Sequence, residues 1–419
     1  MVYEEVEMYI FKAAVVGAGF MGAEIAQVIT YAGLPVVLKD IDQEMLDKGM
    51  EAIRAIYRRR VDKGKMTTTT MQEKVDLVIP TLSYDEFADV DIVIEAVPEN
   101  MKIKQQVFAE LDEVCPPETI FASNTSALSI QEMGSATKRS HKVVGLHFFS
   151  PAHLMKLVEV VRSPDTGQET VDDVVQFSEE LRKIPVVVRE CPGFLVNRIL
   201  VPYLFEAILS LQEGAATASE IDRAMTGFGW PMGPFTLMDM IGIGVSYHTA
   251  VYMASKRKGL TVPPLLEKLY QAGRLGEKAG AGFYGYGDQT DEPVKEMIKE
   301  IQAQPGATTG TEFSVERLMM PLVNEAALCV MEEIANINDI DMACIAGLGM
   351  QVRQEDGQVV RMGPLEYADN VGLDVVVEKL EELERKFGPR FHPVDLLYQK
   401  VKAGELGKKT GRGFMEYTT

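Results

Sequence analysis

Short apolar runs alternate with amphipathic segments along the first third of the chain. Short apolar runs bounded by turn residues are typical of buried strands, and apolar positions three or four residues apart, as over 20–33, predict helices. Strands that alternate with helices predict a mostly parallel sheet covered by helices on both faces. The strand-like runs cover residues 11–16, 35–40, 92–97, 119–123, 142–149 and 156–161.

The later part of the chain has a different sequence pattern. Long helical patterns replace the strand-like runs, and turns rich in glycine and proline separate these helical patterns. These patterns repeat. The segment around Glu206 resembles the segment around Glu325, and the segment around Gly276 resembles the segment around Gly407. The second copy carries an insertion at 351–361, whose central Asp-Gly favours a solvated hairpin or loop.

We therefore predict an α/β fold with a Rossmann-type doubly wound sheet, followed by two all-α domains related by internal duplication. The nucleotide-type domain is placed at residues 1–188, the first helical domain at 189–304 and its repeat at 305–419. We expect the two helical copies to pack as a pseudo-dimer within the chain. Because only the first domain contains a glycine loop, one active site per chain is expected.

Composition narrows the classes of function. The chain has 42 Lys and Arg against 62 Asp and Glu, a formal charge of −20, which disfavours nucleic acid and anionic membranes as partners. No uncharged apolar run is long enough to predict a membrane span. The cysteines show no metal-ligand spacing, so no metal site is predicted, and we expect free thiols in a cytoplasmic protein. They are Cys115, Cys191, Cys329 and Cys344.

The sequence GAGFMG after the first strand-like run fits the pattern G-x-G-x-x-G. This pattern is typical of dinucleotide binding when it connects a strand to a helix, because the helix N-terminus attracts phosphates. Asp40 ends the next run, where a carboxylate accepts hydrogen bonds from ribose hydroxyls and repels a 2′-phosphate. This favours NAD over NADP, although Lys39 beside it is an opposing signal. An ordinary glycine turn with a capping aspartate is the alternative. The predicted loop residues are Gly17, Gly19, Phe20, Met21 and Gly22.

One histidine stands out as a possible general base. His147 lies at the end of a strand-like run, where ligands gather in doubly wound sheets, and its ordinary pKa is near neutral. Glu159 lies inside the next apolar run, and a buried carboxylate there needs a partner. If the two runs are adjacent strands, Glu159 would fix the tautomer of His147 and stabilise its imidazolium. A core histidine with a structural hydrogen bond is the alternative.

Several motifs occur in an order that resembles the 3-hydroxyacyl-CoA dehydrogenase family, and the resemblance covers nearly the whole chain. The doubled helical part is similar to the dehydrogenase half of multifunctional fatty-acid oxidation enzymes. The resemblance implies NAD-dependent oxidation of 3-hydroxyacyl-CoA to 3-oxoacyl-CoA, and it suggests association with other β-oxidation enzymes. The motifs are GAGFMGAEIAQV, EAVPEN, SNTS, HFFSPAHLMKLVEVV, CPGFLVNRIL, WPMGPF and GEKAGAGFYGY.

The resemblance also implies roles for individual residues. His147 would be the general base paired with Glu159, Ser126 would bond the reacting oxygen, and Asn197 would hold the acyl end of the substrate. Many family members carry asparagine where this chain has Ser150, whose reach is shorter. Beyond the glycine loop and Asp40, the residues expected to contact NAD are Val97, Glu99, Lys104, Ser150 and Lys278.

A basic cluster at 58–65 is unusual in so acidic a chain. Arg59 and Lys63 belong to it, and we expect them to contact the phosphates of CoA, whereas a solvated helix face is the alternative. Two other functions stay open. One is dehydrogenation of a free hydroxy acid, against which the basic cluster argues. The other is a non-catalytic structural or nucleotide-binding role, against which the joint presence of the predicted site residues argues.

Overall fold

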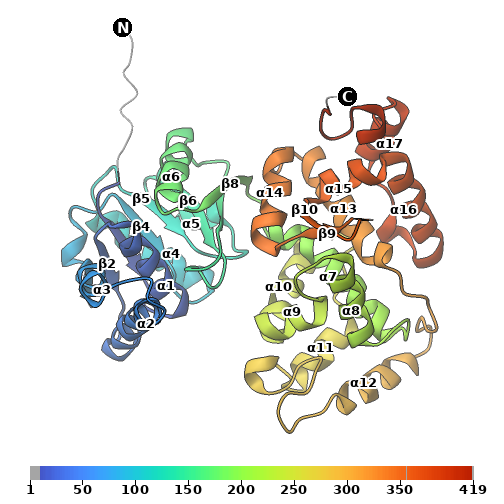
Figure 1. Cartoon of the computed structure of the whole chain (residues 1–419). Coiled ribbons are helices and arrows are strands. Elements are labelled where there is room, and N and C mark those ends of the chain that lie inside the picture. The colour runs from blue at the N-terminus through green and yellow to red at the C-terminus, as the bar shows by residue number, and fades with distance from the viewer. Residues whose placement is uncertain (1–9, 355, 418–419) are drawn as a thin grey trace. The chain divides into compact units, whose positions relative to one another are not determined.

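The computed structural model describes residues 10–354 and 356–417. It contains two compact units, one ending at Phe194 and one beginning at Leu195 (Figure 1). This division lies close to the boundary predicted near residue 188. Within the described ranges, no helix is long and apolar enough to cross a bilayer. The further division of the helical part into two domains stays a prediction.

The first unit is built on an eight-stranded sheet with the order β3-β2-β1-β4-β5-β6-β7-β8. The strands pair in parallel, except that β7 runs antiparallel to β6. The order of the first six strands is that of a doubly wound dinucleotide-binding fold, which confirms the predicted fold class. The strands are β1 Ala13–Val16, β2 Val36–Lys39, β3 Val78–Thr81, β4 Ile92–Glu95, β5 Ile120–Ser123, β6 Val143–Phe148, β7 Leu157–Arg162 and β8 Ile184–Arg189.

Six α-helices accompany this sheet in the described part of the unit. Strands β1, β2, β4 and β5 are buried along their whole length, because helices cover them and their side chains are almost all apolar. The core therefore lies between the sheet and the helices, and the carboxyl ends of the strands are left for a site. The helices are α1 Phe20–Ala32, α2 Gln43–Asp62, α3 Thr68–Val75, α4 Met101–Val114, α5 Ile130–Gly134 and α6 Gln168–Glu180.

The second unit is helical, apart from a hairpin of β9 (Gln351–Arg353) and β10 (Val359–Arg361), which lies in the insertion predicted at 351–361. The prediction of a hairpin or loop there is confirmed. The helices are α7 Val196–Gln212, α8 Ala218–Phe228, α9 Pro234–Ile241, α10 Ile243–Lys256, α11 Pro264–Gln271, α12 Glu292–Gln302, α13 Val315–Met331, α14 Ile337–Leu348, α15 Pro364–Val371, α16 Leu373–Phe387 and α17 Asp395–Lys402.

Buried ion pairs join α7 to α13 in a reciprocal pattern. Arg198 Nε lies 2.7 Å from Glu325 Oε1, and Arg317 Nε lies 3.1 Å from Glu206 Oε2. Arg317 also lies 2.7 Å from Glu213, whose equivalent Glu332 lies 2.8 Å from Arg198. Each arginine thus neutralises two glutamates of the other half.

Buried aspartates recur in the two halves as well. Asp222 accepts hydrogen bonds from two backbone N–H groups at the start of α9, and Asp341 accepts two from the start of α15. Asp222 also accepts hydrogen bonds from the hydroxyl groups of Thr236 and Tyr284. The corresponding bonds in the second half come from the backbone alone, which leaves the Asp341 carboxylate less well compensated for its burial. Shared ancestry of the two halves stays a prediction that this repetition favours.

The burial of Asp341 predicts a pH dependence of stability. Burial raises the pKa of Asp341 from its ordinary value of 3.8 to about 7. Between these values the folded protein keeps a proton that the unfolded chain has released, so the free energy of unfolding falls as the pH rises from about 4 to about 7. The expected slope is about 1.4 kcal/mol per pH unit.

Urea unfolding at about pH 5 and about pH 7 measures this slope. Asp341→Asn cannot titrate, so its stability deficit relative to the unmodified protein should shrink as the pH rises. All other ionisable groups are common to both proteins. A deficit that is the same at both pH values would contradict the assignment.

Candidate functional site

The glycine loop lies between β1 and α1, as the motif predicts. Gly17 has φ +103°, a backbone conformation that favours glycine, and its N–H donates to Lys39 O at 2.8 Å. A Cβ at Gly22 would lie 1.8 Å from the carbonyl oxygen of Gly17, so the turn requires glycine there. A Cβ at Gly19 would meet no atom within 4 Å, which leaves room for a ligand against the backbone.

The start of α1 suits an anion. Phe20, Met21 and Gly22 lie in its first turn, this turn contains no acidic residue, and the N-cap Gly19 provides no side-chain cap. The partial positive charge of a helix N-terminus is therefore not neutralised locally. Asp40 borders the same loop, because its Oδ2 accepts the N–H of Ala18 at 2.7 Å. Lys39 is buried with its ammonium 4.2 Å from the centre of the Tyr84 ring. This contact orients Lys39 toward Tyr84.

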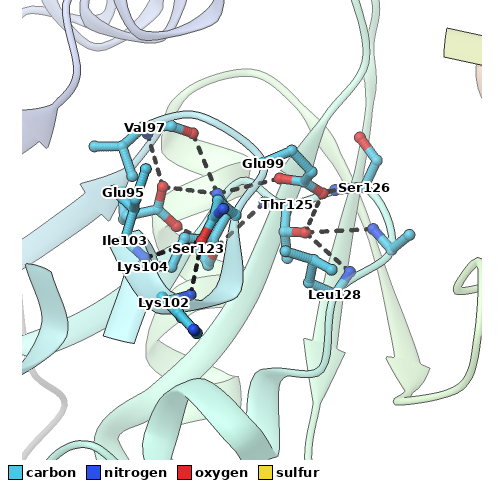
Figure 2. Close-up of polar contacts among 12 residues, drawn as sticks. Glu95, Val97, Glu99, Lys102, Ile103, Lys104, Ser123, Thr125, Ser126 and Leu128 are labelled. Carbon is cyan, nitrogen blue, oxygen red and sulfur yellow. Dashed lines mark hydrogen bonds and ion pairs between the residues drawn. The ribbon is translucent and has the colours of Figure 1, made fainter. Parts of the chain in front are cut away.

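A buried charge network lies beyond β4 and β5 (Figure 2). Glu95, at the end of β4, accepts hydrogen bonds from Lys104 Nζ at 2.8 Å, from Ser123 Oγ at 2.6 Å and from Val97 N at 2.7 Å. Lys104 comes from α4, is 1% exposed, and also lies 3.2 Å from Glu99. The network fixes the 97–99 segment, which was predicted to contact the cofactor, relative to two strands.

Glu99 extends this network to the segment that follows β5. Its Oε1 accepts the hydroxyl of Thr125 at 2.5 Å and the N–H of Ser126 at 3.2 Å, and Figure 2 shows these contacts. Ser126 itself is exposed. Lys104, by contrast, lies beneath this surface, so the structure places it behind Glu99. Its predicted contact with NAD stays a prediction.

His147 and Glu159 face each other on adjacent antiparallel strands. They are register partners in the β6–β7 pair, and His147 Nδ1 lies 2.7 Å from Glu159 Oε2. The Glu159 side chain is fully buried and the His147 side chain is 7% exposed. The rings of Phe149 and Phe194 pack against the imidazole at 4.5 and 6.0 Å. The pairing of the two residues follows the prediction.

This geometry gives the imidazole a defined chemistry. A carboxylate at Nδ1 accepts the proton of that nitrogen, which leaves Nε2 as the basic nitrogen of the neutral ring. When Nε2 takes up a proton, the buried carboxylate stabilises the imidazolium. The strand end is held in place as well, because Asn124 Oδ1 accepts the N–H of Phe148 at 2.8 Å.

The other predicted site residues are distributed over both units. Ser150 is exposed, three residues beyond His147. Asn197 and Lys278 belong to the second unit, Asn197 in α7 and Lys278 in a short 3₁₀ turn at Glu277–Ala279. Their roles at the site stay predictions.

The predicted basic cluster borders a cavity of about 420 Å³ in the first unit. Arg59 and Lys63 line it, together with basic residues that lie far away in the sequence. None of the described residues lining it is acidic. Arg58, by contrast, is exposed and pairs with Glu51 at 3.4 Å. The basic lining consists of Arg59, Arg60, Lys63, Lys65, His153, Lys156, Arg182 and Lys183.

Four of these eight basic residues were not predicted from the sequence. His153, Lys156, Arg182 and Lys183 follow β6 or precede β8, and only the folded sheet brings them to α2. The local sequence holds no signal for this, because the four residues are not clustered with 58–65. Elsewhere in the described ranges, no group of three or more His, Cys, Asp or Glu is arranged to hold a metal ion.

The strand order and the glycine loop define a dinucleotide-binding protein. Comparison with protein families shows to which family of such proteins the chain belongs. The model of the NAD binding domain of 3-hydroxyacyl-CoA dehydrogenase matches residues 12–191. The model of the C-terminal domain of the same enzymes matches residues 193–286 and 313–417. The chain belongs to the 3-hydroxyacyl-CoA dehydrogenase family.

Relatives and solved structures agree with this family. The fatty acid oxidation complex subunit alpha of Psychrobacter arcticus is 40% identical over 94% of this chain and 55% of its own length. The subunit of the same name from Pseudomonas aeruginosa is 36% identical over 96% of this chain and 57% of its own length. The chain therefore spans little more than half of these relatives.

Two solved structures cover most of the chain. The 3-hydroxybutyryl-CoA dehydrogenase of Escherichia coli has a TM-score of 0.84 at 28% identity, covering 95% of this chain and 100% of that protein. The dehydrogenase part of multifunctional enzyme 1 from Caenorhabditis elegans has a TM-score of 0.65 at 25% identity, covering 94% of this chain and 90% of that one. Most of the chain is thus similar in structure to these two proteins.

Proposed function

We propose that this chain catalyses the reversible, NAD-dependent oxidation of 3-hydroxyacyl-CoA to 3-oxoacyl-CoA. The observation that carries the proposal is the His147–Glu159 pair at 2.7 Å, placed on a dinucleotide-binding sheet. Membership of the family and the names of the relatives support the substrate class. The same names support association with other β-oxidation enzymes, which stays a prediction, as does a cytoplasmic location.

The residues of the glycine loop fit NAD, because the backbone at Gly19 is open and Asp40 borders the loop. When bound, NAD supplies the hydride acceptor. We infer that Gly17, Gly19, Phe20, Met21 and Gly22 hold its phosphates and that Asp40 bonds a ribose. Val97, Glu99, Lys104, Ser150 and Lys278 remain the proposed contacts elsewhere, and Lys104 also pairs with Glu99.

His147 is the general base in this proposal. Its Nε2 removes the proton of the 3-hydroxyl as C3 is oxidised, and Glu159 stabilises the imidazolium that forms. In the reverse direction the imidazolium returns the proton to the 3-oxo oxygen. Ser126 would donate a hydrogen bond to this oxygen, and Asn197 would hold the acyl thioester. The buried Glu95–Lys104 pair would keep Glu99, and through it Ser126, in place.

The basic cavity is the proposed site for the phosphates of CoA. A chain with charge −20 needs local cations to bind so anionic a group, and the cavity concentrates them. Arg59→Glu or Lys63→Glu should raise KM for acetoacetyl-CoA about tenfold, since a factor of ten is about 1.4 kcal/mol and one charge-assisted hydrogen bond supplies that much. KM for NADH should stay unchanged in steady-state kinetics.

Arg58→Glu is the matched control for these two variants. It makes the same charge change one residue away, but Arg58 lies outside the cavity lining and is exposed. An equal rise of KM in all three variants would indicate a general effect of charge and would contradict a specific site.

One assay separates the proposed function from its alternatives. Oxidation of NADH, followed at its absorbance band, is expected with acetoacetyl-CoA and is expected to be far slower with free acetoacetate, which lacks the anionic nucleotide. Comparable rates with both would favour a free hydroxy-acid dehydrogenase. Binding of NADH without turnover of either compound would favour a non-catalytic protein.

A further inference from the structure

The loop between His147 and Glu159 is held at a single residue from two sides. The N–H of Ala152 donates to Glu24 Oε2, and the carbonyl of Ala152 accepts from Lys183 Nζ. Lys183 also donates to Met155 O at 2.8 Å. Ala152 is 1% exposed, so its own N–H and carbonyl groups are shielded from water, and hydrogen bonds to charged groups are strong in such surroundings.

Glu24 connects this loop to the helix of the glycine motif. It lies in the second turn of α1, its side chain is 6% exposed, and its Oε1 lies 3.3 Å from His153 Nδ1. A carboxylate buried to this degree needs compensating charge. Lys183 supplies positive charge near it, and His153 of the loop supplies more when its imidazole is protonated. The predicted phosphate-binding helix and the catalytic strands are thereby joined through one acidic side chain.

The two basic groups of this arrangement also line the basic cavity. Burial and, to a smaller extent, the charge of Lys156 lower the pKa of Lys183 to about 8, and the charge of Glu24 opposes this shift. Burial also lowers the pKa of His153, with Arg59 and Lys183 acting in the same direction against Glu24. An anion in the cavity opposes both shifts, because it favours the protonated forms.

The charged groups facing His153 and Lys183 come from every side of the cavity. Glu24 from α1 is the acidic group among them, and the basic groups are more numerous. These cations are Arg59 and Arg60 from α2, Lys63 and Lys65 from the α2–α3 turn, Lys156 from the loop before β7, and Arg182 before β8. Without a bound anion, the mutual repulsion of these cations disfavours the charged state of Lys183 and His153.

We propose that Glu24, His153 and Lys183 form a clamp on Ala152, and that a phosphate group bound in the basic cavity tightens this clamp. The clamp positions Ser150 and His147, so binding of the remote nucleotide of the substrate raises the rate of the chemical step. Glu24 and Lys183 are positioning residues, because they act through the loop. The inference rests on the proposed function, since the phosphate is assigned to CoA.

The first test uses the unmodified protein and does not depend on turnover. The chain has five histidines, so the imidazole C–H signals can be followed by NMR as the pH is varied, and His153→Gln identifies the signal of His153. Adenosine 3′,5′-bisphosphate is expected to raise the titration midpoint of His153 by at least half a pH unit. Inorganic phosphate at the same concentration is expected to shift it less.

Two outcomes of this titration would overturn the proposal. One is a midpoint that does not move although calorimetry shows that the bisphosphate binds. The other is the absence of bisphosphate binding. Failure of the proposed function is detected separately, as lack of NADH oxidation with acetoacetyl-CoA.

The second test compares two substrates. The N-acetylcysteamine thioester of acetoacetate has the reacting group of acetoacetyl-CoA without its phosphates. From about pH 7 to about pH 9 Lys183 loses its proton when the cavity is empty. The ratio of kcat for acetoacetyl-CoA to kcat for the thioester is therefore expected to rise about tenfold over this range. Effects of pH on the chemical step itself are common to both substrates and cancel in the ratio, so a constant ratio would contradict the clamp.

Variants separate the clamp from simple charge attraction. Lys183→Met is expected to lower kcat for both substrates about tenfold, and Lys183→Arg, which keeps a cation, should recover part of the loss. Lys156→Met removes another cation of the cavity and should raise KM for acetoacetyl-CoA instead. Lys48→Met, at an exposed pair with Glu44, is the surface control. If Lys183→Met changed only KM, as Lys156→Met does, the clamp would be refuted.

Discussion

Replacing His147 by glutamine is expected to lower kcat about 10²- to 10⁴-fold, the usual contribution of a general acid or base. Glutamine keeps a polar side chain of similar reach opposite Glu159 but has no group that can take up a proton near neutral pH. The loss should therefore fall on kcat, while the dissociation constant of NADH, measured by fluorescence, changes less than twofold. The glycine loop and Asp40 follow other strands, β1 and β2, and are expected to remain intact.

Glu159→Gln is the companion variant. An amide at this position still bonds the Nδ1 side of the imidazole but no longer stabilises its charged form, so we expect a smaller loss of kcat than in His147→Gln. The double variant should be no slower than His147→Gln, because Glu159 acts through the histidine. Full turnover by His147→Gln would rule out this histidine as the base, and losses that multiply in the double variant would rule out action through one pair.

Replacing Arg317 by methionine is expected to destabilise the second unit by about 3–5 kcal/mol, the cost of leaving a buried ion pair without one partner. Arg317 is 1% exposed and neutralises Glu206 and Glu213, which are 3% and 7% exposed. Removal of the guanidinium leaves the buried Glu213 with the hydroxyl of Thr311 and leaves Glu206 with Arg390. A loss of this size should lower Tm by about 10 °C.

The single tryptophan provides the measurement. Trp230 is 3% exposed and stacks on Tyr203 of α7 at 4.9 Å, so its fluorescence reports unfolding of the helical unit. Lys299→Met is the control, since Lys299 forms an exposed pair with Glu296 and such pairs contribute less than about 1 kcal/mol. If Arg317→Met and Lys299→Met had the same Tm, the buried ion pairs of Arg317 would contribute no more to stability than an exposed surface pair.

The sequence predicts those parts of the fold in which one local pattern suffices. The buried strands β1, β2 and β4 are continuous apolar runs, and the glycine motif identifies the turn that follows the first of them. The strand β3 is not recognisable, because it lies at the edge of the sheet, contains Pro80 and has only one fully buried position. The antiparallel direction of β7 was not predicted either, since direction depends on a connection that local pattern does not encode.

The same distinction holds for the candidate site: local patterns predict some of its residues, and folding alone brings the others together. The pairing of His147 with Glu159 could be predicted because both lie in neighbouring apolar runs that form adjacent strands. The cavity could be predicted only on its α2 side. Lys183 reaches it from a segment more than a hundred residues beyond Arg59, and Glu24 looks like any polar position of an amphipathic helix. Three-dimensional proximity between such distant residues leaves no signal in one sequence.

The reciprocal pairs between α7 and α13 also restrict how this sequence can change over generations. An arginine lost from α7 or α13 removes a counter-charge from two acids of the other half, although Glu206 keeps Arg390 and Glu325 keeps Arg257. A compensating change in the other half is therefore favoured. Positions with fewer shared contacts are free to diverge, as the contrast between Tyr284 and Met415 at matching places illustrates. Each half therefore limits which mutations the other half can accept. This holds although only the first half follows a domain with a glycine loop.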